Sequence, residues 1–433
     1  MKSATVLTKQ TQIAELARKL PGRRLVSLNH HLDLEWMQEA CRKTRKDGAP
    51  GVDGTTWDEY SVGLDARLTD LLNRAKSGDS YRAPPVRRVQ IPKDNGETRP
   101  LGIPTLEDKI LQRAVVMALE PVYEPEFLDC SEGFRPGRSA HRALRKLWSH
   151  IMATGGCWLI DADISKFFDT LDKAVLRDLL NQRVGDGVIR RLIGKWLSAG
   201  VLDHGVMSYP EAGTPQGGVI SPMLSNIYLH HVLDLWFEHT VKPRLRGRAW
   251  LLRFADDFVM GFEREDDARR VYAVLFKRFE KHGLRIHPEK TRLVPFFPPE
   301  TRGGCRETFN FLGFTHSWGT SRKGWAYVRR QTMSKRLTRA LDGIRTYCRK
   351  SRSLPLASQW ADLKRKMQGH YAYYGITGNW RQIANFAYEA ARIWRFWLNR
   401  RSASRDMPWR RFKAVLARFP LPPPRIVHSV YAQ

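Results

Sequence analysis

The sequence has few cysteines and no long apolar run. Its five cysteines are scattered over 433 residues without any Cys-x-x-Cys pair, a pattern that predicts a reducing compartment and argues against a zinc site. No stretch approaches the roughly 18 apolar residues that a transmembrane helix needs, and the first 20 residues lack the apolar core of a signal peptide. No membrane association is therefore expected.

The chain is also poor in acidic residues relative to basic ones. It has 44 Asp and Glu against 73 Lys and Arg, so its formal net charge is +29 and its pI is near 10.2. An excess of this size says little about the fold, but it predicts a polyanionic partner. Nucleic acid is favoured over an anionic membrane surface.

Most of the excess positive charge lies after residue 320. Residues 320–433 hold 25 Lys and Arg but 4 Asp and Glu. A helix is predicted at 333–350, with an apolar stripe formed by Leu337, Leu341, Ile344 and Cys348. Its other faces carry Lys335, Arg336, Arg339, Arg345 and Arg349. Such a face is often merely solvated, but acidic partners are nearly absent here, so nucleic-acid contact is predicted.

Hydrophobic patterning predicts a mixture of helices and short strands. In chain order it predicts helices within 1–80 around a Gly-rich turn at 47–60, a β-hairpin at 86–104, a helix at 105–129, a buried strand at 157–164, a strand–turn–strand unit at 251–262 and a strand at 309–314. Another helix is predicted to begin with Ser221 as N-cap and Pro222 as its first residue. Its apolar positions are Leu224, Ile227, Tyr228, His231 and Leu235. The Pro-rich segment 419–433 is predicted to be extended.

Three aspartates stand where predicted strands end. Asp163 ends the strand at 157–164, and Asp256 and Asp257 occupy the turn within 251–262. If these strands are neighbours in one sheet, the three carboxylates converge and cations must neutralise their repulsion. Mg²⁺ prefers such oxygen ligands, and two ions about 3.5–4 Å apart can support nucleotidyl transfer. Two acids in a turn are a weak signal by themselves, because Asp is a common turn residue.

The order of several sequence blocks strengthens this hypothesis. "DADISKFFD" (161–169), "GTPQGGVISPMLSNIYL" (213–229), "RFADDFVMGF" (253–262), "GLRIHPEKT" (283–291) and "FNFLGF" (309–314) resemble, in this order, the reverse transcriptase palm. Upstream, "IPKDNGETRPLGIPTLEDKILQRAV" and "SEGFRPGRSAHRAL" resemble the fingers of group II intron reverse transcriptases. Downstream, "LKRKMQGHYAYYGITGNW" and "IWRFWLNRRS" resemble the maturase domain of that family. The resemblance covers roughly residues 30–405.

The resemblance implies an α+β fold of the right-hand polymerase type. Fingers and palm with an antiparallel sheet would be followed by an α-helical thumb and maturase domain. The implied domains are an N-terminal helical extension and fingers at 1–80, fingers and palm at 81–315, thumb and maturase domain at 320–405, and a basic Pro-rich tail at 406–433. Many relatives end in a zinc-stabilised HNH endonuclease, and the lack of Cys pairs predicts that this domain is absent.

The resemblance also assigns a metal site. Two Mg²⁺ ions, which Mn²⁺ could replace, would be bound by three carboxylates and one backbone carbonyl. The carboxylates are those of Asp163, Asp256 and Asp257, and the carbonyl is that of Ile164. The three aspartates are the implied catalytic residues. Asp161 and Asp169 lie close by in the sequence and are weaker candidates for direct ligands.

Five residues are implied to bind the incoming deoxynucleoside triphosphate (dNTP): Lys93, Arg99, Phe168, Gln216 and Lys290. Lys93 and Arg99 flank the predicted hairpin tip, where two cations could clamp a triphosphate, although a solvated tip is the alternative. Phe168 would stand against the sugar 2′ position, or it is a core phenylalanine. Gln216 precedes two glycines that permit close backbone approach, and Lys290 is a candidate general acid.

Two further positions complete the comparison with the family. Phe254 stands where the family usually has tyrosine, so a hydroxyl is missing while a ring is kept; activity is expected to survive. His230 and His231 are interpreted as core or surface residues and not as ligands.

The predicted function is that of an RNA-directed DNA polymerase that also binds its group II intron RNA as a maturase, aiding splicing and retrohoming. Its partners would be intron RNA, RNA template, DNA primer and dNTPs in the bacterial cytoplasm, near the nucleoid when DNA is bound; a homodimer is left open. Two alternatives remain: a splicing-only RNA-binding maturase, against which the intact aspartates argue, and a domesticated reverse transcriptase in defence or repair.

Overall fold

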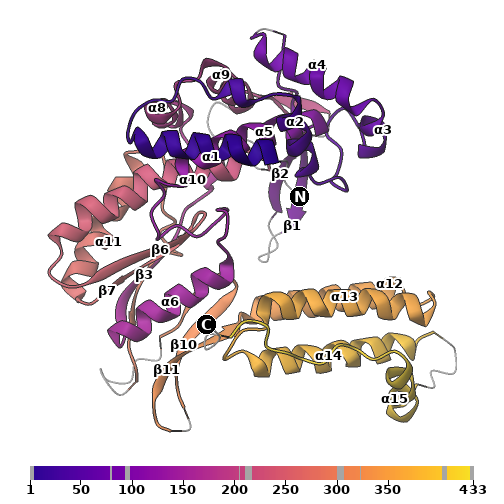
Figure 1. The fold of residues 1–433 in the computed structure, drawn as a ribbon. Helices are drawn as coiled ribbons and strands as arrows, with labels where there is room; N and C mark the ends of the chain where they lie inside the picture. The colour runs from indigo at the N-terminus through magenta and orange to yellow at the C-terminus, as the bar shows by residue number, and fades with distance from the viewer. Residues whose placement is uncertain are drawn as a thin grey trace. The chain divides into compact units, whose positions relative to one another are not determined.

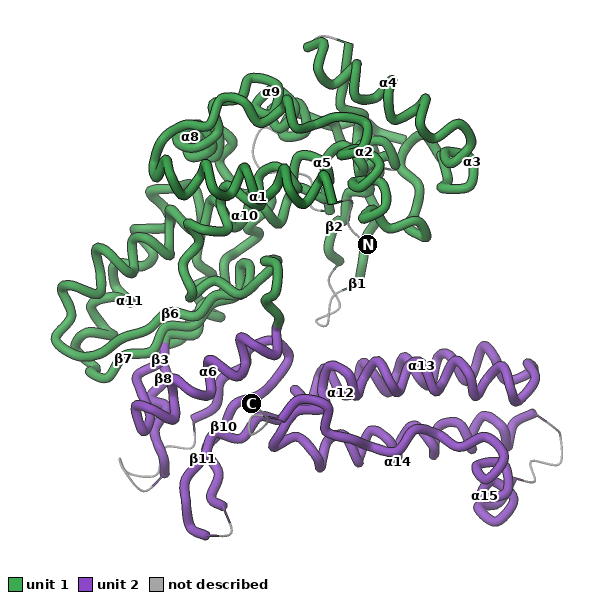
Figure 2. The backbone as a smooth tube through the Cα atoms, in the orientation of Figure 1, with its two compact units in different colours: residues 1–139, 160–293 green, residues 140–159, 294–433 purple. Residues whose placement is uncertain are grey.

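The computed structural model describes most of the chain, namely residues 4–78, 80–92, 98–203, 205–209, 217–299, 307–321, 323–401 and 407–429. Two compact units can be distinguished, one formed by residues 1–139 and 160–293 and the other by residues 140–159 and 294–433 (Figure 2). The functional domain limits predicted above remain predictions.

The first unit is built around a buried helix, α5 (Leu106–Tyr123). The predicted helix at 105–129 is thus confirmed, although it ends earlier than expected. Thr105 is its N-cap, and the indole of Trp36 donates to the Ala114 carbonyl at 3.0 Å. The other helices of this unit are α1 (Ala4–Lys19), α2 (Leu34–Arg42), α3 (Trp57–Ser61), α4 (Leu64–Lys76), α7 (Phe167–Thr170), α8 (Lys173–Arg183), α9 (Gly187–Leu197), α10 (Ser221–Leu229) and α11 (Glu265–Glu280) (Figure 1).

The predicted hairpin at 86–104 is confirmed. Strands β1 (Val86–Pro92) and β2 (Thr98–Ile103) pair antiparallel, with Ile91 opposite Arg99. The residues of the hairpin tip lie outside the described part of the chain. Strands β4 (Val201–Asp203) and β5 (Val206–Ser208) extend this sheet in the order β2-β1-β4-β5, with β1 and β4 parallel.

A second sheet brings together the strands that carry the predicted acids. Its order is β6-β7-β3-β8, where β6 is Ala249–Phe254, β7 is Asp257–Phe262, β3 is Cys157–Asp163 and β8 is Arg292–Phe296. The predicted strand at 157–164 and the strand–turn–strand unit at 251–262 are both confirmed. Trp250 stands opposite Gly261, and a Cβ on Gly261 would lie 2.2 Å from the indole ring, so this glycine makes room for the ring.

Helix α10 departs from the prediction at both ends. It begins at Ser221 with Ile220 in the N-cap position, so Ser221 is not the N-cap and no side chain caps the helix. After Leu229 the chain continues as a π-helical turn, His230–Asp234. Because this turn shifts the helical register, Val232 and Leu233 are buried, whereas the predicted stripe residues His231 and Leu235 are half-buried.

The second unit joins a small sheet to a helical region. The predicted strand at 309–314 is in fact two strands, β9 (Phe309–Phe311) and β10 (Phe314–Thr320), joined at Leu312 and Gly313. Both linking residues have positive φ, 50° and 78°, as a two-residue hairpin turn requires. The sheet order is β11-β10-β9, with β11 at Ala326–Thr332. Helix α6 (Ala140–Thr154) packs against β11.

Four helices form the C-terminal core: α12 (Ser334–Lys350), α13 (Leu356–Tyr374), α14 (Trp380–Leu398) and α15 (Trp409–Arg418). The predicted apolar stripe of α12 is confirmed, since Ile344 and Cys348 are buried in this core and Leu337 and Leu341 pack against it. Helix α15 lies within the segment predicted to be a tail, and its Phe412 is fully buried beside Trp394.

The described residues thus form a mixed α/β chain with several small sheets and a helical C-terminal region. The α+β class expected from the sequence agrees with this architecture. Across the described ranges, none of the helices combines the length and the apolarity that a membrane span requires.

A buried acid lies in the first turn of α5. Asp108 is 2% exposed and accepts a hydrogen bond from the hydroxyl of Tyr81, which in turn accepts one from the indole of Trp196 at 2.8 Å. Burial raises the pKa of Asp108 to about 7, although the hydrogen bond from Tyr81 opposes the shift. The folded protein therefore retains a proton that the unfolded chain releases near pH 4.

We expect Asp108→Asn to flatten the pH dependence of stability. A raised pKa in the folded state stabilises the protein fully below pH 4, and this contribution is lost as pH rises through 7. Between pH 5 and 8 the free energy of unfolding of the wild type should fall by about 2–3 kcal/mol more than that of the variant. Urea unfolding at both pH values measures this difference, and equal pH slopes in the two proteins would contradict it.

Candidate active site

The hairpin formed by β6 and β7 presents the paired acids. Phe254 pairs with Asp257, so Ala255 and Asp256 form a two-residue turn. Ala255 has a φ of 57°, a left-handed conformation that costs an alanine about 1 kcal/mol. The strand after Asp257 is buried from Phe258 onward. A rigid strand pair therefore holds a strained turn, and Asp256 and Asp257 are half-buried at its end.

Strand β3 brings the third acid to the same sheet, next to β7. Beyond Asp163 the chain pairs with 285–287, because His287 N donates to the Asp163 carbonyl and Ser165 N donates to the Arg285 carbonyl, both at 2.8 Å. Carbonyls alternate in direction along an extended chain. The Ile164 carbonyl is therefore directed away from 285–287.

The charges of these residues are coupled. Burial raises the pKa of Asp256, the positive charge of Arg99 opposes this shift, and the negative charge of Asp163 adds to it. Asp163 forms an ion pair with Lys290 at 3.0 Å. On the same side of β3, burial raises the pKa of Asp161 to about 6, and Arg292 lies 3.5 Å from its carboxylate.

The donor set fits a hard divalent cation. Carboxylates that are partly withdrawn from water, such as that of Asp256, whose pKa is raised by burial and by the neighbouring charge of Asp163, are the oxygen ligands that Mg²⁺ or Mn²⁺ would neutralise. Among the described residues, however, no three His, Cys, Asp or Glu side chains are arranged as a complete metal-binding group. The Asp163 carboxylate is instead turned to Lys290.

The structure places three of the five predicted dNTP residues. Arg99 is exposed at the start of β2 and lies near enough to Asp256 to influence its pKa. Phe168 is half-buried in α7, with its ring edge against Phe167, so the pocket and core interpretations both remain. Lys290 is an ion-pair partner of Asp163.

Two of the predicted dNTP residues, Lys93 and Gln216, lie outside the described residues. Gly217, next to Gln216, has a φ of 117°, and a Cβ there would lie 2.3 Å from the Gly102 carbonyl. At Gly217 the backbone therefore lies close to strand β2; the predicted close approach of these glycines to a nucleotide stays a prediction. The weaker ligand candidate Asp169 is exposed in α7.

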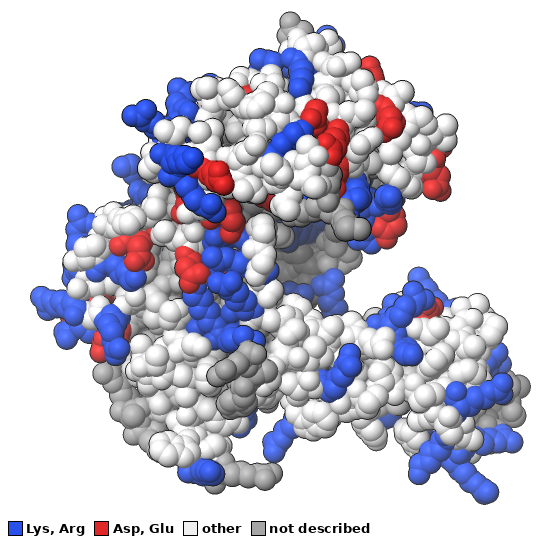
Figure 3. Space-filling view, in the orientation of Figure 1, with Lys and Arg blue, Asp and Glu red and all other residues white. Residues whose placement is uncertain are grey.

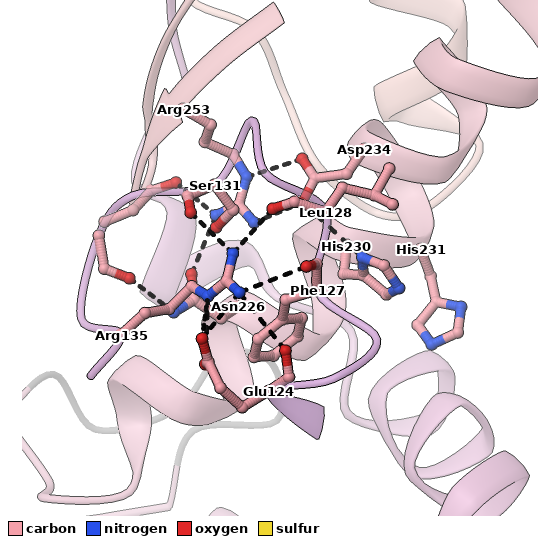
Figure 4. Close-up of polar contacts among 12 residues, drawn as sticks. Glu124, Phe127, Leu128, Ser131, Arg135, Asn226, His230, His231, Asp234 and Arg253 are labelled. Carbon is pink, nitrogen blue, oxygen red and sulfur yellow. Dashed lines mark hydrogen bonds and ion pairs between the residues drawn. The ribbon is translucent and has the colours of Figure 1, made fainter. Parts of the chain in front are cut away.

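Sequence reasoning missed a buried arginine, Arg253, which lies three residues before Asp256 in the chain and is shown with its partners in Figure 4. Arg253 is 0% exposed and forms a two-pronged ion pair with Asp234, at 2.9 Å from Nε and 2.6 Å from Nη2. Its Nη1 donates to Asn226 Oδ1 and to the Ala255 carbonyl, each at 3.0 Å. Burial lowers the pKa of Arg253, but the charge and the hydrogen bonds of Asp234, with smaller contributions from Cys130 and Asp256, together outweigh burial and the pKa is raised. The available signal was a charged residue inside an apolar strand, "LLRFADD".

A neighbouring loop packs against the same turn. Arg253 N donates to the Cys130 carbonyl, and its carbonyl accepts from Glu132 N, both at 2.8 Å. A Cβ on Gly133 would lie 2.4 Å from Ala255 N. The Gly133 carbonyl is fixed by Asn226 Nδ2 at 2.8 Å. At Gly133 the backbone of this loop therefore lies so close to the acid turn that a side chain would not fit there.

A second buried arginine fixes the other end of this loop (Figure 4). Arg135 donates to Glu124 and to the carbonyls of Leu128 and Ser131, both at 2.7–2.8 Å.

His230 packs its ring edge on Phe127, and burial lowers its pKa to about 4, so it is neutral at neutral pH. Its interpretation as a core residue agrees with this burial.

Comparison with known families decides the identity of the chain. The family described as reverse transcriptase (RNA-dependent DNA polymerase) matches residues 91–316, more than half of the sequence. This chain belongs to the reverse transcriptase family. The matched region contains the acid-bearing sheet and the hairpin of β1 and β2. Membership in this family implies that the protein binds a nucleic-acid template and primer, uses dNTPs and requires a divalent metal ion.

Individual relatives of this reverse transcriptase point to group II introns. Protein YkfC of Escherichia coli (strain K12) is 40% identical over 257 residues, covering 52% of this chain and 67% of YkfC. Group II intron-encoded protein LtrA of Lactococcus lactis subsp. cremoris is 41% identical over 183 residues, which is 42% of this chain and 30% of LtrA. Nuclear intron maturase 4, mitochondrial, of Arabidopsis thaliana is 28% identical over 41% of this chain and 24% of its own length. The chain therefore matches less than a third of the latter two relatives.

The predicted nucleic-acid residues of this reverse transcriptase are all exposed on α12: Lys335, Arg336, Arg339, Arg345 and Arg349. Arg345 forms an ion pair with Asp342. In the face shown in Figure 3, lysine and arginine side chains are spread over the helical C-terminal region with few acidic side chains among them. The aromatic residues of "YAYYGITGNW" are divided, since Tyr371 is fully buried and Trp380 is 51% exposed.

Proposed function

We propose that this reverse transcriptase synthesises DNA on an RNA template at a two-metal site formed by Asp163, Asp256, Asp257 and the Ile164 carbonyl. The observation that carries this proposal is the arrangement of β3 beside the β6–β7 hairpin, with Asp163 close enough to Asp256 for its charge to help raise the pKa of Asp256. The β6-β7-β3-β8 sheet would be the palm, the hairpin of β1 and β2 part of the fingers, and α12–α15 the thumb and maturase domain. Primer extension on an RNA template with Mg²⁺ is the assay that tests it.

The protein's own side chains would mainly bind and orient the reactants. When bound, two Mg²⁺ ions would activate the primer 3′-hydroxyl and neutralise charge on the triphosphate. Arg99, which lies near enough to Asp256 to influence its pKa, would contact phosphate, to which an arginine can donate two parallel hydrogen bonds. Phe168 would restrict the sugar 2′ position. Lys290 holds its ammonium group on Asp163, where it could donate a proton to the leaving pyrophosphate.

We further propose that the helical region binds intron RNA and supports splicing as a maturase does. Support comes from the exposed basic side chains of α12 and from the similarity to an intron-encoded protein. A splicing-only protein would not need Asp163, Asp256 and Asp257, and all three are present. A domesticated enzyme remains the alternative, and it would lack a cognate intron RNA.

Reversing charge on α12 should weaken RNA binding without harming DNA synthesis. We expect Arg339→Glu/Arg349→Glu to lower affinity for intron RNA and to make the plot of log affinity against log salt shallower, by about 0.7–0.9 for each phosphate that the helix no longer neutralises. Arg269→Glu/Arg270→Glu on α11 is the matched control, because it changes the same charge on another exposed helix. Filter binding across a salt series measures both. If affinity and slope match the wild type, α12 is only a solvated helix.

A further inference from the structure

The guanidinium of Arg253 connects three parts of the first unit. The side chain belongs to β6, and two of its nitrogens donate hydrogen bonds to the carboxylate of Asp234. The third nitrogen donates to Asn226 and to the Ala255 carbonyl (Figure 4). Every bond is 3.0 Å or shorter, and neither member of the ion pair is exposed. The Ala255 carbonyl belongs to the strained turn that carries Asp256.

The π-helical turn allows the two helical partners to face the same arginine. Asn226 and Asp234 are eight residues apart, which on a regular α-helix places them about 80° apart around the axis. A π-helical turn, His230–Asp234, adds one residue to the helix without adding a turn. Asp234 then stands as though it were seven residues after Asn226, which is close to two full α-helical turns.

The buried ion pair of Arg253 and Asp234 adds little to the stability of the fold, but it fixes the orientation of the groups that it contacts. A buried ion pair contributes little net stability compared with packed apolar side chains, because desolvation offsets the attraction. The planar guanidinium, in contrast, fixes its partners at defined angles. Asn226, which Arg253 holds through its Oδ1, in turn donates a hydrogen bond to the Gly133 carbonyl and so also fixes the loop that packs against Ala255.

We propose that Arg253 is a positioning residue: anchored by Asp234 and Asn226, it holds the Ala255 carbonyl and thereby sets the direction of the Asp256 carboxylate toward the metal and the primer. The inference rests on the proposed role of Asp256 as a metal ligand. It assigns Arg253 no contact with substrate.

The test replaces the ion pair by apolar side chains of similar size, in the double variant Arg253→Met/Asp234→Leu of the full chain. We expect this variant to fold, with an unfolding midpoint close to that of the wild type, and to bind template–primer normally. The rate of single-nucleotide incorporation at saturating substrates should fall about 10–100-fold, as is typical when the partner that orients a metal ligand is lost. KM for the dNTP should stay near its wild-type value.

Metal binding supplies a readout apart from activity. The Mn²⁺ affinity of the protein alone, measured by the electron paramagnetic resonance of free Mn²⁺, should fall by about the same factor of 10–100. Asp234→Asn keeps the shape of the side chain and removes its charge, so it should fold even if the double variant does not. Its incorporation rate and Mn²⁺ affinity should fall less than those of the double variant.

The matched control is another buried arginine, Arg183, which pairs with Glu126 and donates to the Leu20 carbonyl at 2.9 Å. Arg183→Met/Glu126→Leu should leave incorporation rate and Mn²⁺ affinity unchanged. Wild-type values in Arg253→Met/Asp234→Leu or in Asp234→Asn would overturn the inference, and so would an equal loss in the control. If Asp256→Ala itself remains active, the proposed site fails; if only the Arg253 variants remain active, the positioning role alone fails.

Discussion

Alanine at Asp256 and Asp257 is expected to abolish Mg²⁺-dependent cDNA synthesis. Removing one fixed charge-stabilising group from an active site typically costs about 100–1,000-fold in rate, and the double variant removes two of the three proposed metal-binding carboxylates. The loss should therefore reach at least about 1,000-fold. It should appear in the rate constant at saturating dNTP, because the acids act on the reacting atoms.

Primer extension on an RNA template, with wild type and variant side by side, measures this loss. Asp169→Ala is the matched control, since Asp169 is an exposed acid six residues after Asp163 in the sequence and is expected to be dispensable. RNA binding should survive in all three proteins, because the basic side chains of α12 are untouched. Undiminished synthesis by the Asp256→Ala/Asp257→Ala protein would refute the site.

The second large effect is expected at Gly133, where a methyl group should damage both stability and catalysis. A Cβ at this position would stand 2.4 Å from Ala255 N, a distance that backbone atoms cannot tolerate, so the loop or the acid turn must move. Overpacking of this kind costs about 1–3 kcal/mol. A displacement of about 1 Å in a catalytic group can cost about 100-fold in rate.

Thermal unfolding and single-nucleotide incorporation by Gly133→Ala test this expectation together. Gly194→Ala in α9 is the control, because among the described residues no atom outside the backbone of the same helix lies within 4 Å of its Cβ position, and alanine favours a helix. The control should be as active as the wild type and at least as stable. A Gly133→Ala protein with wild-type rate would show that the turn adapts.

Local sequence patterns predicted the elements that carry the acids, because these elements follow short-range rules. The apolar strands around Asp163 and Asp256 end where the acids begin, and the stripe of α12 repeats at helical spacing. The metal assignments came from the family resemblance and stay predictions. Lys93 and Gln216 fall in segments outside the described residues.

The interactions that hold the site in place were not predictable in the same way. Arg253 finds its partner 19 residues earlier in the chain, and Gly133 meets a turn more than a hundred residues away. Hydrophobic periodicity contains no information on such pairs. The periodicity itself misled at Leu235, because a π-helical turn changes the register without any change in composition.

The π-helical turn His230–Asp234 also bears on how this helix can change length in evolution. A chain one residue shorter between Asn226 and Asp234 would form a regular α-helix and still present both side chains to the same arginine. A chain one residue longer would turn Asp234 away by about 100°. Alignments of related sequences should therefore tolerate a single gap within this stretch, and exclude insertions there.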